Sequence, residues 1–220
     1  MKVLLQNPEA RSCEGAPCPG PLGTVRALPG ALLMALAFAF VLPVACSHRV
    51  SGWGNLTVTD LDGRRHQPLG QPGQKAAVFV FLANDCPIAN RAAPEIQRLH
   101  QEFAPHGVSF WMVHANADET PESIRQHARE YSLPGTLLRD PQADLARLSG
   151  VHVTPEAAVV LADGRVVYRG RLDNRFIRLG VERTVVTSRD VAEVLSAVVA
   201  GREVASTNVP GVGCHIPGVQ

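Results

Sequence analysis

The sequence predicts an α/β fold with a central mixed sheet flanked by helices. Two observations predict it. Continuous apolar runs, typical of strands that are buried on both faces, alternate with segments whose apolar residues recur at helical spacing. Later in the chain a hairpin pattern replaces this alternation, and one more helix follows. Because strands connected through helices pair in parallel and hairpin strands pair antiparallel, the sheet should contain both arrangements.

The first half of the chain contains two runs that are expected to be buried strands. Residues 56–60 (LTVTD) alternate as a short strand, and a turn-rich stretch separates them from the run 76–82 (AAVFVFL). The second buried strand is expected over residues 107–115 (GVSFWMVHA). Between the two runs, five apolar residues fall on one side of an expected helix: Ile88, Ala92, Ile96, Leu99 and Phe103.

The second half of the chain completes the sheet. Thr120 is expected to cap a helix that has Pro121 at its first position, where proline is favoured. A turn at Asp163-Gly164 joins the two strands of the hairpin. The elements expected here are, in order, a helix over 119–133, a short strand over 135–140, a short helix over 144–150, the hairpin over 153–170, and a helix over 188–201 that Ser188 caps and Gly201 stops.

Residues 1–54 are expected to be a signal or anchor segment with a linker. Their apolar run, 31–44, is shorter than the roughly 20 residues that span a membrane and suits the h-region of a signal peptide, about 7–15 residues long. The run ends in LPVAC, which is similar to the lipobox of bacterial lipoproteins except that Pro43 stands where leucine is usual. We therefore expect an exported, periplasmic or cell-envelope protein. Cys46 is the candidate lipidation site that would tether it to a membrane.

Three alternatives remain open for this segment. Cleavage near Cys46 without acylation is one, and a helix buried in the mature domain is another. The 24 residues before Val25 are long for the charged region of a signal peptide, so translation starting near Val25 is a further hypothesis.

Net charge and cysteine content limit the classes of function that the sequence supports. A net charge of +1 gives no electrostatic reason to expect nucleic acid as a partner. Of the five cysteines, Cys13 and Cys18 precede the apolar run and would be removed with it on cleavage of the signal peptide, and Cys46 is the possible lipid site. The exported domain keeps Cys86 and Cys214, which are 128 positions apart. In an oxidising compartment, two such cysteines are expected to pair or to react.

Cys86 lies where a buried strand ends and a helix begins, in the stretch NDCPIANRAAPEI. Pro87 suits the first helical position, because its missing N–H is one that the helix could not use. Cys86 is then the N-cap, where the amides of Ile88 and Ala89 and the helix dipole favour a thiolate and lower the cysteine pKa. The carboxylate of Asp85 opposes this effect. A buried, inert cysteine is the alternative interpretation.

These features together resemble the thioredoxin-like superfamily, in its exported redoxin branch, over residues 55–201. Pro94 lies eight positions after Cys86, where thioredoxins have a proline that kinks the helix. The stretch VTPEAAVVL is similar to the cis-proline segment of the superfamily, with Thr154 before Pro155, and DGRVVYRG is similar to its closing hairpin.

The resemblance implies a three-layer thioredoxin-like fold and thiol–disulfide chemistry at Cys86, without a cofactor or a metal. It also implies that Pro155 is cis and presents backbone beside the cysteine. Pro87, Thr154 and Pro155 are the residues that would contact the substrate, either a protein or a small thiol or disulfide. A redox partner protein would exchange electrons with the cysteine.

The sequence departs from its relatives at three positions. Ala89 replaces the second cysteine of the Cys-x-x-Cys motif, so the local dithiol of ordinary thioredoxins is absent. Peroxiredoxins carry a proline seven positions and a threonine three positions before their peroxidatic cysteine, where this chain has Phe79 and Ala83. A thiol peroxidase using the same cysteines is therefore an alternative rather than the main prediction.

Residues 202–220 are expected to be a flexible tail that carries Cys214. The stretch GVGCHI is similar to a C-terminal Gly-Cys-x-Ile element of some redoxin-type proteins whose helix begins Cys-Pro-Ile. Cys214 lies thirteen positions after Gly201, so this tail can reach at most about 45 Å. A domain of this size has a radius of gyration near 15 Å, roughly. Cys214 could therefore return to Cys86 and resolve a mixed disulfide, or it could form intermolecular bonds instead.

Two further possibilities concern other side chains. His114 and His215, together with both cysteines, would form a soft thiolate–imidazole set suited to Cu(I), which makes a copper-handling binding protein an alternative function. A non-catalytic thioredoxin-like module is another alternative function.

The loop 173–190 is longer than a minimal thioredoxin needs. It carries three arginines: Arg175, Arg178 and Arg183. They would either line a substrate groove or remain solvated.

Overall fold

A computed structural model describes residues 52–219. The expectations for Cys46 and for the apolar run lie outside these residues. Among the described residues, no helix is both long enough and apolar enough to span a bilayer.

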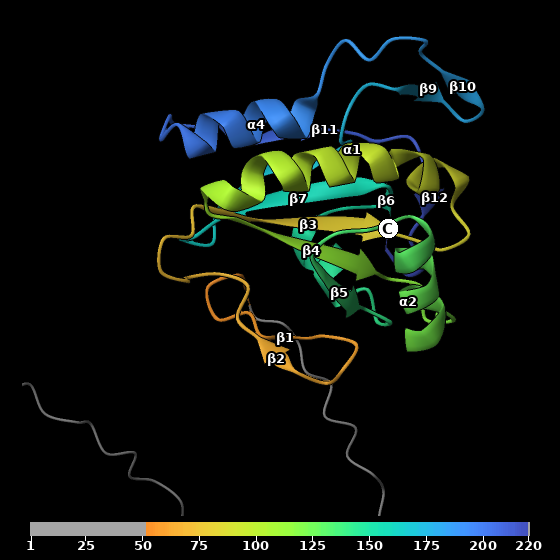
Figure 1. The fold of residues 1–220 in the computed structure, drawn as a ribbon, viewed down its shortest axis with the longest axis horizontal. Helices are drawn as coiled ribbons and strands as arrows, with labels where there is room; N and C mark the ends of the chain where they lie inside the picture. Colours follow the sequence, from red (N-terminus) through yellow and green to blue (C-terminus); the bar gives the residue numbers. More distant parts are fainter. Residues whose placement is uncertain (1–51, 220) are drawn as a thin grey trace, which may run out of the picture. The chain divides into compact units, whose positions relative to one another are not determined.

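The core of the fold is a six-stranded mixed sheet in the order β11-β8-β7-β3-β4-β5 (Figure 1). The central strand β3 pairs in parallel with β4, and β4 pairs in parallel with β5. On its other side β3 pairs antiparallel with β7, which in turn pairs antiparallel with β8. The predicted mixed sheet is therefore confirmed. The strands are β3 (Ala76–Leu82), β4 (Val108–His114), β5 (Thr136–Arg139), β7 (Glu156–Leu161), β8 (Val166–Gly170) and β11 (Thr207–Val209).

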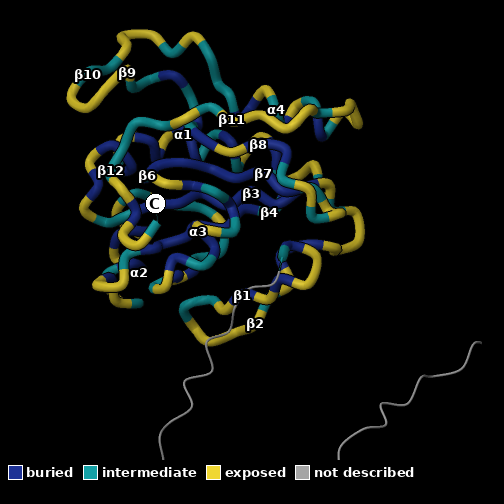
Figure 2. Tube along the Cα trace, turned by 180° about the vertical axis from the view of Figure 1, so that it is seen from behind, coloured by how far each residue is buried: buried dark blue, intermediate teal, exposed yellow. Residues whose placement is uncertain are grey.

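Helices cover both faces of this sheet, because alternate side chains of each buried strand point to opposite faces. In β3, Val78 and Val80 pack in one apolar cluster with residues of α1 and α4, whereas Phe79 and Phe81 pack in a second cluster with residues of α3. The central strands are dark blue in Figure 2, which shows that they are buried on both sides. The helices are α1 (Pro87–Phe103), the 3₁₀ helix η1 (Ala104–His106), α2 (Pro121–Glu130), α3 (Asp144–Ser149) and α4 (Asp190–Val199).

The helix starts follow the local sequence, with one exception. Pro87 and Pro121 are the first residues of α1 and α2, and Thr120 caps α2 by accepting a hydrogen bond from the Ser123 amide at 3.2 Å. The prediction that Ser188 caps the last helix is wrong. The N-cap is the next residue, and the Ser188 carbonyl instead accepts a hydrogen bond from the Asn174 amide.

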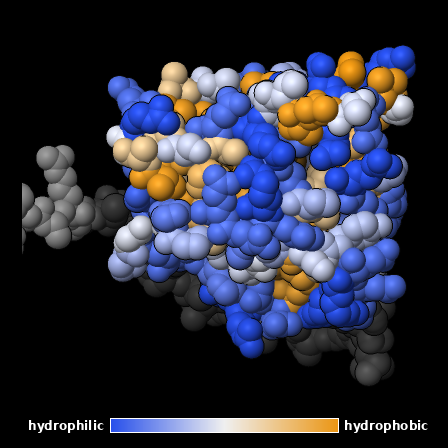
Figure 3. All heavy atoms as spheres, turned by 45° about the horizontal axis from the view of Figure 1, so that its top comes forward, coloured by the Kyte–Doolittle hydropathy of each residue, from blue (hydrophilic) through white to orange (hydrophobic). Residues whose placement is uncertain are grey.

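Four short strands form two small antiparallel pairs outside the main sheet. β1 (Val58–Thr59) pairs with β2 (Arg65–His66), and β9 (Phe176–Arg178) pairs with β10 (Val181–Glu182) in a hairpin before α4. Three large apolar side chains of this region are exposed: Ile177, Leu179 and Val185. On the face seen in Figure 3, apolar residues form small separate groups in a mainly hydrophilic surface.

The residues after α4 have a regular arrangement that the sequence pattern did not predict. β11 joins the edge of the main sheet, in parallel with β8. Further along, β12 (Cys214–His215) pairs antiparallel with β6 (Val153–Thr154), the strand just before Pro155. The segment expected to be a tail is therefore connected to the domain at two places.

Candidate active site

Cys86 is the N-cap of α1 and is fully buried, whereas the neighbouring Pro87 is exposed. Its thiol donates a hydrogen bond to the Thr154 carbonyl at 3.1 Å. The protonated side chain therefore makes no capping hydrogen bond. Of the two amides that we expected to stabilise a thiolate, that of Ala89 is among the groups that lower the pKa of Cys86.

Cys214 lies directly opposite Thr154 in the β12–β6 pair. The Thr154 hydroxyl donates a hydrogen bond to the Cys214 carbonyl at 3.5 Å, and the Cys214 side chain is half-buried. The preceding residue must be small. A Cβ at Gly213 would lie 1.9 Å from the Thr154 carbonyl oxygen, so any side chain there would push the strands apart. The chain thus brings together two sulfur atoms that are far apart in the sequence.

The two thiols form an unequal pair. Burial raises the pKa of Cys86, but hydrogen bonds from the Cys214 thiol, from Thr154 and from the amides of Ala89 and Cys214 outweigh it, so this pKa is below its ordinary value. The pKa of Cys214 is raised to about 11 by burial, by the hydrogen bond to Cys86 and by the negative charges of Cys86 and Asp85. Cys86 is thus the sulfur that ionises first, and Cys214 is the proton donor to it.

Removing the Cys214 thiol should raise the pKa of Cys86. The hydrogen bond from Cys214 is the largest of the effects that lower this pKa, so a Cys214→Ala variant should titrate at a higher pH than the wild type. A smaller thiolate fraction would then be present at neutral pH. The measurement is the rate of alkylation of Cys86 as a function of pH, resolved by mass spectrometry of the Cys86 peptide.

Cys214→Ser is the matched control for this prediction, since its hydroxyl can still donate a hydrogen bond. We expect its titration midpoint to lie between those of the wild type and of Cys214→Ala. A Cys214→Ala midpoint that equals or falls below that of the wild type would contradict the assignment of Cys214 as the donor.

The sequence profile of the family described as Redoxin matches residues 48–178, which is more than half of the chain. The chain belongs to the redoxin family. Cys86, Thr154 and Pro155 lie inside the matched range, whereas Cys214 lies beyond it. The resemblance to a thioredoxin-like redoxin domain is therefore confirmed.

Relatives of this redoxin agree with the fold. The Thiol-disulfide oxidoreductase ResA of Bacillus thuringiensis subsp. konkukian is 24% identical over 113 residues, which cover 51% of this chain and 64% of that protein. An uncharacterised conserved protein from Geobacillus kaustophilus has a TM-score of 0.62 at 28% identity, over 73% of this chain and 87% of its own. A hypothetical protein from Sinorhizobium meliloti 1021 has the same TM-score at 24% identity, over 73% and 89%. The three-layer thioredoxin-like fold of this redoxin is thus shown.

In this redoxin the Thr154–Pro155 peptide bond is cis, as the resemblance led us to expect. Glu156 follows it and is buried at the start of β7. One of its carboxylate oxygens accepts a hydrogen bond from the Gly211 amide at 2.6 Å, and the other accepts one from the His152 amide at 3.1 Å. Glu156 therefore connects the cis-proline segment to the start of the segment that carries Cys214.

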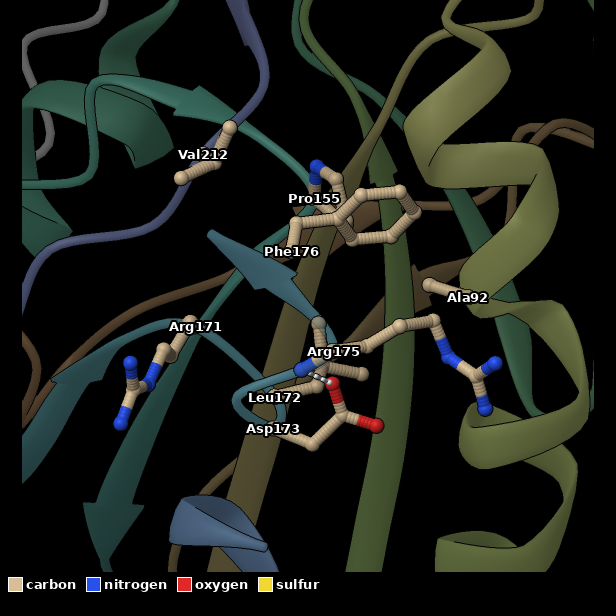
Figure 4. A pocket seen from close by; sticks show the side chains of 8 residues that line it. All are labelled: Ala92, Pro155, Arg171, Leu172, Asp173, Arg175, Phe176 and Val212. Carbon is tan, nitrogen blue, oxygen red and sulfur yellow. Dashed lines mark hydrogen bonds between the residues drawn. The ribbon is translucent and has the colours of Figure 1, made fainter. Parts of the chain in front are cut away.

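Pro155 also lines a pocket of the redoxin domain (Figure 4). The ring of Phe176 lies beside Pro155, and Asp173 accepts a hydrogen bond from the Arg175 amide at 2.9 Å. Burial raises the pKa of the Asp173 carboxyl. Of the three loop arginines, Arg175 lines this pocket, which is consistent with the substrate-groove interpretation for that residue. The other two are exposed: Arg178 and Arg183.

A ring of polar side chains lies behind the loop that carries Cys86. Glu119 accepts a hydrogen bond from the Asn84 amide at 2.6 Å, and its other oxygen bonds His114 Nδ1 at 2.9 Å. The His114 ring packs edge-on against His127, whose Nε2 is 2.7 Å from Asn90 Oδ1. Asn90 closes the ring by donating to the Asn84 carbonyl at 3.2 Å. These contacts fix the backbone two residues before Cys86.

Glu119→Ala should lower the free energy of unfolding of this redoxin by about 3 kcal/mol, because it leaves the half-buried backbone amide of Asn84 and the buried His114 ring without their acceptor. Urea denaturation followed by circular dichroism measures this change. Glu122→Ala is the control, since Glu122 is exposed and should contribute less than about 0.5 kcal/mol. Equal losses in the two variants would contradict a structural role for the ring.

The copper hypothesis gains no support from the described residues. Within residues 52–219, no group of three or more histidine, cysteine, aspartate or glutamate side chains is arranged to hold a metal ion. His114 is fully buried and bonded to Glu119, and His215 is exposed and lies opposite Val153. His114 therefore lies apart from the cysteines, whereas His215 lines the same pocket as Cys214.

Sequence reasoning missed Glu119 and Glu156. A signal for Glu156 was present, because a carboxylate at the start of the otherwise apolar strand EAAVVL needs a partner when it is buried. No comparable signal marks Glu119. It stands next to the cap of α2 in a segment where acidic residues are ordinary.

Proposed function

We propose that this redoxin is an exported thiol–disulfide oxidoreductase in which Cys86 is the nucleophile and Cys214 is the resolving thiol. The observation that carries the proposal is that both cysteines meet at Thr154: Cys214 pairs with it in the β12–β6 pair, and its carbonyl accepts the hydrogen bond from the Cys86 thiol. Relatives named as thiol–disulfide oxidoreductases support the same chemistry, although the chain spans 64% of the length of the first of them.

The reaction follows from the unequal pair of thiols. Cys86 has no exposed surface, so the segment that carries Cys214 must first move away from it. The Cys86 thiolate then attacks one sulfur of a substrate disulfide, and the substrate's other sulfur leaves as a thiolate. Cys214 loses its proton and attacks the Cys86 sulfur in the resulting mixed disulfide. This releases the second substrate thiolate and leaves a Cys86–Cys214 disulfide. Two electrons have then moved from the two cysteines to the substrate, and a thiol-containing redox partner protein must return them.

Substrate contacts are proposed at the exposed Pro87 and at the cis-proline segment. Ala92 and Phe176 line the pocket at Pro155 and offer an apolar surface next to the cis-proline segment. Export is proposed from the apolar run 31–44, and a lipid tether from Cys46. An oxidising compartment is where such a pair of cysteines would be used.

Turnover by the full-length reduced protein tests this function. Reduction of insulin disulfides by a catalytic amount of the protein, with a Cys86–Cys214 disulfide found by non-reducing peptide mapping, is the expected result. Consumption of hydrogen peroxide without disulfide exchange would instead establish a thiol peroxidase. The absence of both activities, together with unpaired Cys86 and Cys214 after oxidation, would overturn the proposal.

A further inference from the structure

The two sulfur atoms of the pair differ in their access to solvent. Cys86 has no exposed surface. Cys214 is half-buried and, with its neighbour His215, lines a hollow together with residues from three other segments: Asp85, Asn116 and Thr154. A molecule that enters this hollow therefore meets Cys214 and not Cys86.

Residues 211–217, which we name the strap, cover Cys86. Cys214 pairs with Thr154, whose carbonyl accepts the hydrogen bond from the Cys86 thiol, and both Val212 and Cys214 pack against the apolar cluster that contains Cys86. The strap thus occupies the edge of the cis-proline segment, where an extended polypeptide would otherwise pair.

The strap is fixed at both ends. At its start, the Gly211 amide donates to the buried Glu156 at 2.6 Å. At its other end, the Ile216 amide donates to the His152 carbonyl at 2.9 Å, and the Ile216 side chain is buried in the second apolar cluster. The β12–β6 pair lies between these two attachments. Because its attachments do not involve the sulfur of Cys214, the strap can keep this position when the two cysteines are joined.

We propose that an incoming small thiol exchanges with the oxidised pair at the Cys214 sulfur, because the strap leaves that sulfur open to the hollow and keeps Cys86 out of reach. The inference rests on the proposed function, since it requires the Cys86–Cys214 disulfide. Asp85 lines the hollow and disfavours an anionic thiol, so an uncharged or cationic small thiol is the class that fits.

The exchange takes two steps, in which the atoms and electrons balance. The thiolate of the small thiol attacks Cys214 Sγ, the Cys86–Cys214 bond breaks, and its electron pair leaves with Cys86 as a thiolate. A second molecule of the thiol then attacks the small-thiol sulfur of the mixed disulfide, which releases a small disulfide and the Cys214 thiolate, and that thiolate takes up a proton. Two thiols are oxidised and two cysteines are reduced. Of the two cysteines, Cys86 has the lower pKa, and a thiolate of lower pKa leaves faster. The pKa values therefore also favour attack at Cys214 with Cys86 as the leaving group.

Mapping of the mixed disulfide tests the inference. Oxidised full-length protein is mixed with cysteamine and quenched with excess N-ethylmaleimide in guanidinium chloride, which exposes Cys86 to the reagent, and its peptides are identified by mass spectrometry. We expect cysteamine on Cys214 and N-ethylmaleimide on Cys86, in at least a tenfold excess over the reverse pattern. A comparable or larger amount of cysteamine on Cys86 would overturn the inference. Absence of the Cys86–Cys214 disulfide before cysteamine is added would overturn the proposed function instead, and this inference with it.

A variant that loosens the strap isolates its role. Gly213→Ala places a Cβ against the Thr154 carbonyl oxygen, so β12 must move away from β6. Cysteamine should then attach to Cys86 in a larger fraction of molecules, by at least threefold. Gly54→Ala is the control, because a Cβ there meets nothing within 4 Å, and it should leave the distribution unchanged. An unchanged distribution in Gly213→Ala would refute the strap as the cause of the selectivity.

Discussion

Replacing Cys86 with serine should lower disulfide turnover at least about a thousandfold, as happens when a nucleophile that acts in a catalytic unit is removed. A serine hydroxyl does not ionise near neutral pH, so neither the hydrogen bond from Cys214 nor the start of α1 can make it a comparable nucleophile. The measurement is the rate of insulin reduction by the full-length protein with an excess of thiol reductant. The folded state of the variant is checked by circular dichroism.

Cys214→Ser separates the two steps of the reaction. This variant should also lose turnover, but it should still form a mixed disulfide between Cys86 and the substrate, which then accumulates because no second thiol resolves it. Cys86→Ser should form no such adduct at residue 86. Turnover in Cys86→Ser above about a tenth of the wild-type rate would show that the other cysteine, or another group, starts the reaction.

Replacing Glu156 with glutamine should raise the rate at which N-ethylmaleimide labels Cys86 in the reduced protein, by roughly 10- to 100-fold. Both carboxylate oxygens of Glu156 accept hydrogen bonds from amides, of Gly211 and of His152. Glutamine has one oxygen, and its amide group would face one of these donors. Losing a charged acceptor costs about 1.5–3 kcal/mol, which corresponds to that range in the population of detached strap. Mass spectrometry of the Cys86 peptide over time gives the rate.

Glu203→Gln is the matched control for this variant, since Glu203 lies between α4 and β11 and is exposed. We expect its labelling rate to stay within about twofold of the wild type. If the two glutamine variants behave alike, Glu156 does not hold the strap, and the burial of Cys86 must have another cause.

The helices and the strands β3, β4, β5, β7 and β8 were predictable because each has a local pattern. The run 76–82 became β3 with the same limits, and its alternate side chains fill the two apolar clusters on either side of the sheet. Thr120 and Pro121 marked the start of α2, because a threonine side chain can cap a helix and proline is favoured at the first helical position. Ser188 failed as a cap because its backbone is engaged by Asn174, a contact between residues 14 positions apart that no local pattern encodes.

The candidate site was predictable only in part. The sequence identified Cys86 at a helix start and Thr154 before a proline of cis-proline type, and it singled out Cys214 as the other cysteine of the domain. It did not predict that Cys214 is held in a strand beside Thr154, or that Cys86 is covered as a result. A segment rich in proline and glycine has no period of its own, so its pairing depends on the edge that it meets.

The amino-acid sequence by itself determined the α/β class, the position of Cys86 at the start of α1 and the absence of a second cysteine at residue 89. Periodicity, proline placement and cysteine spacing act over a few residues and can be read without coordinates. Only the tertiary structure decided which sulfur is buried, which one faces a hollow, and that Glu156 and Gly213 hold the strap in place. The reason is physical: burial and hydrogen bonding between residues 68 or 60 positions apart depend on how the chain packs, and no local pattern specifies that packing.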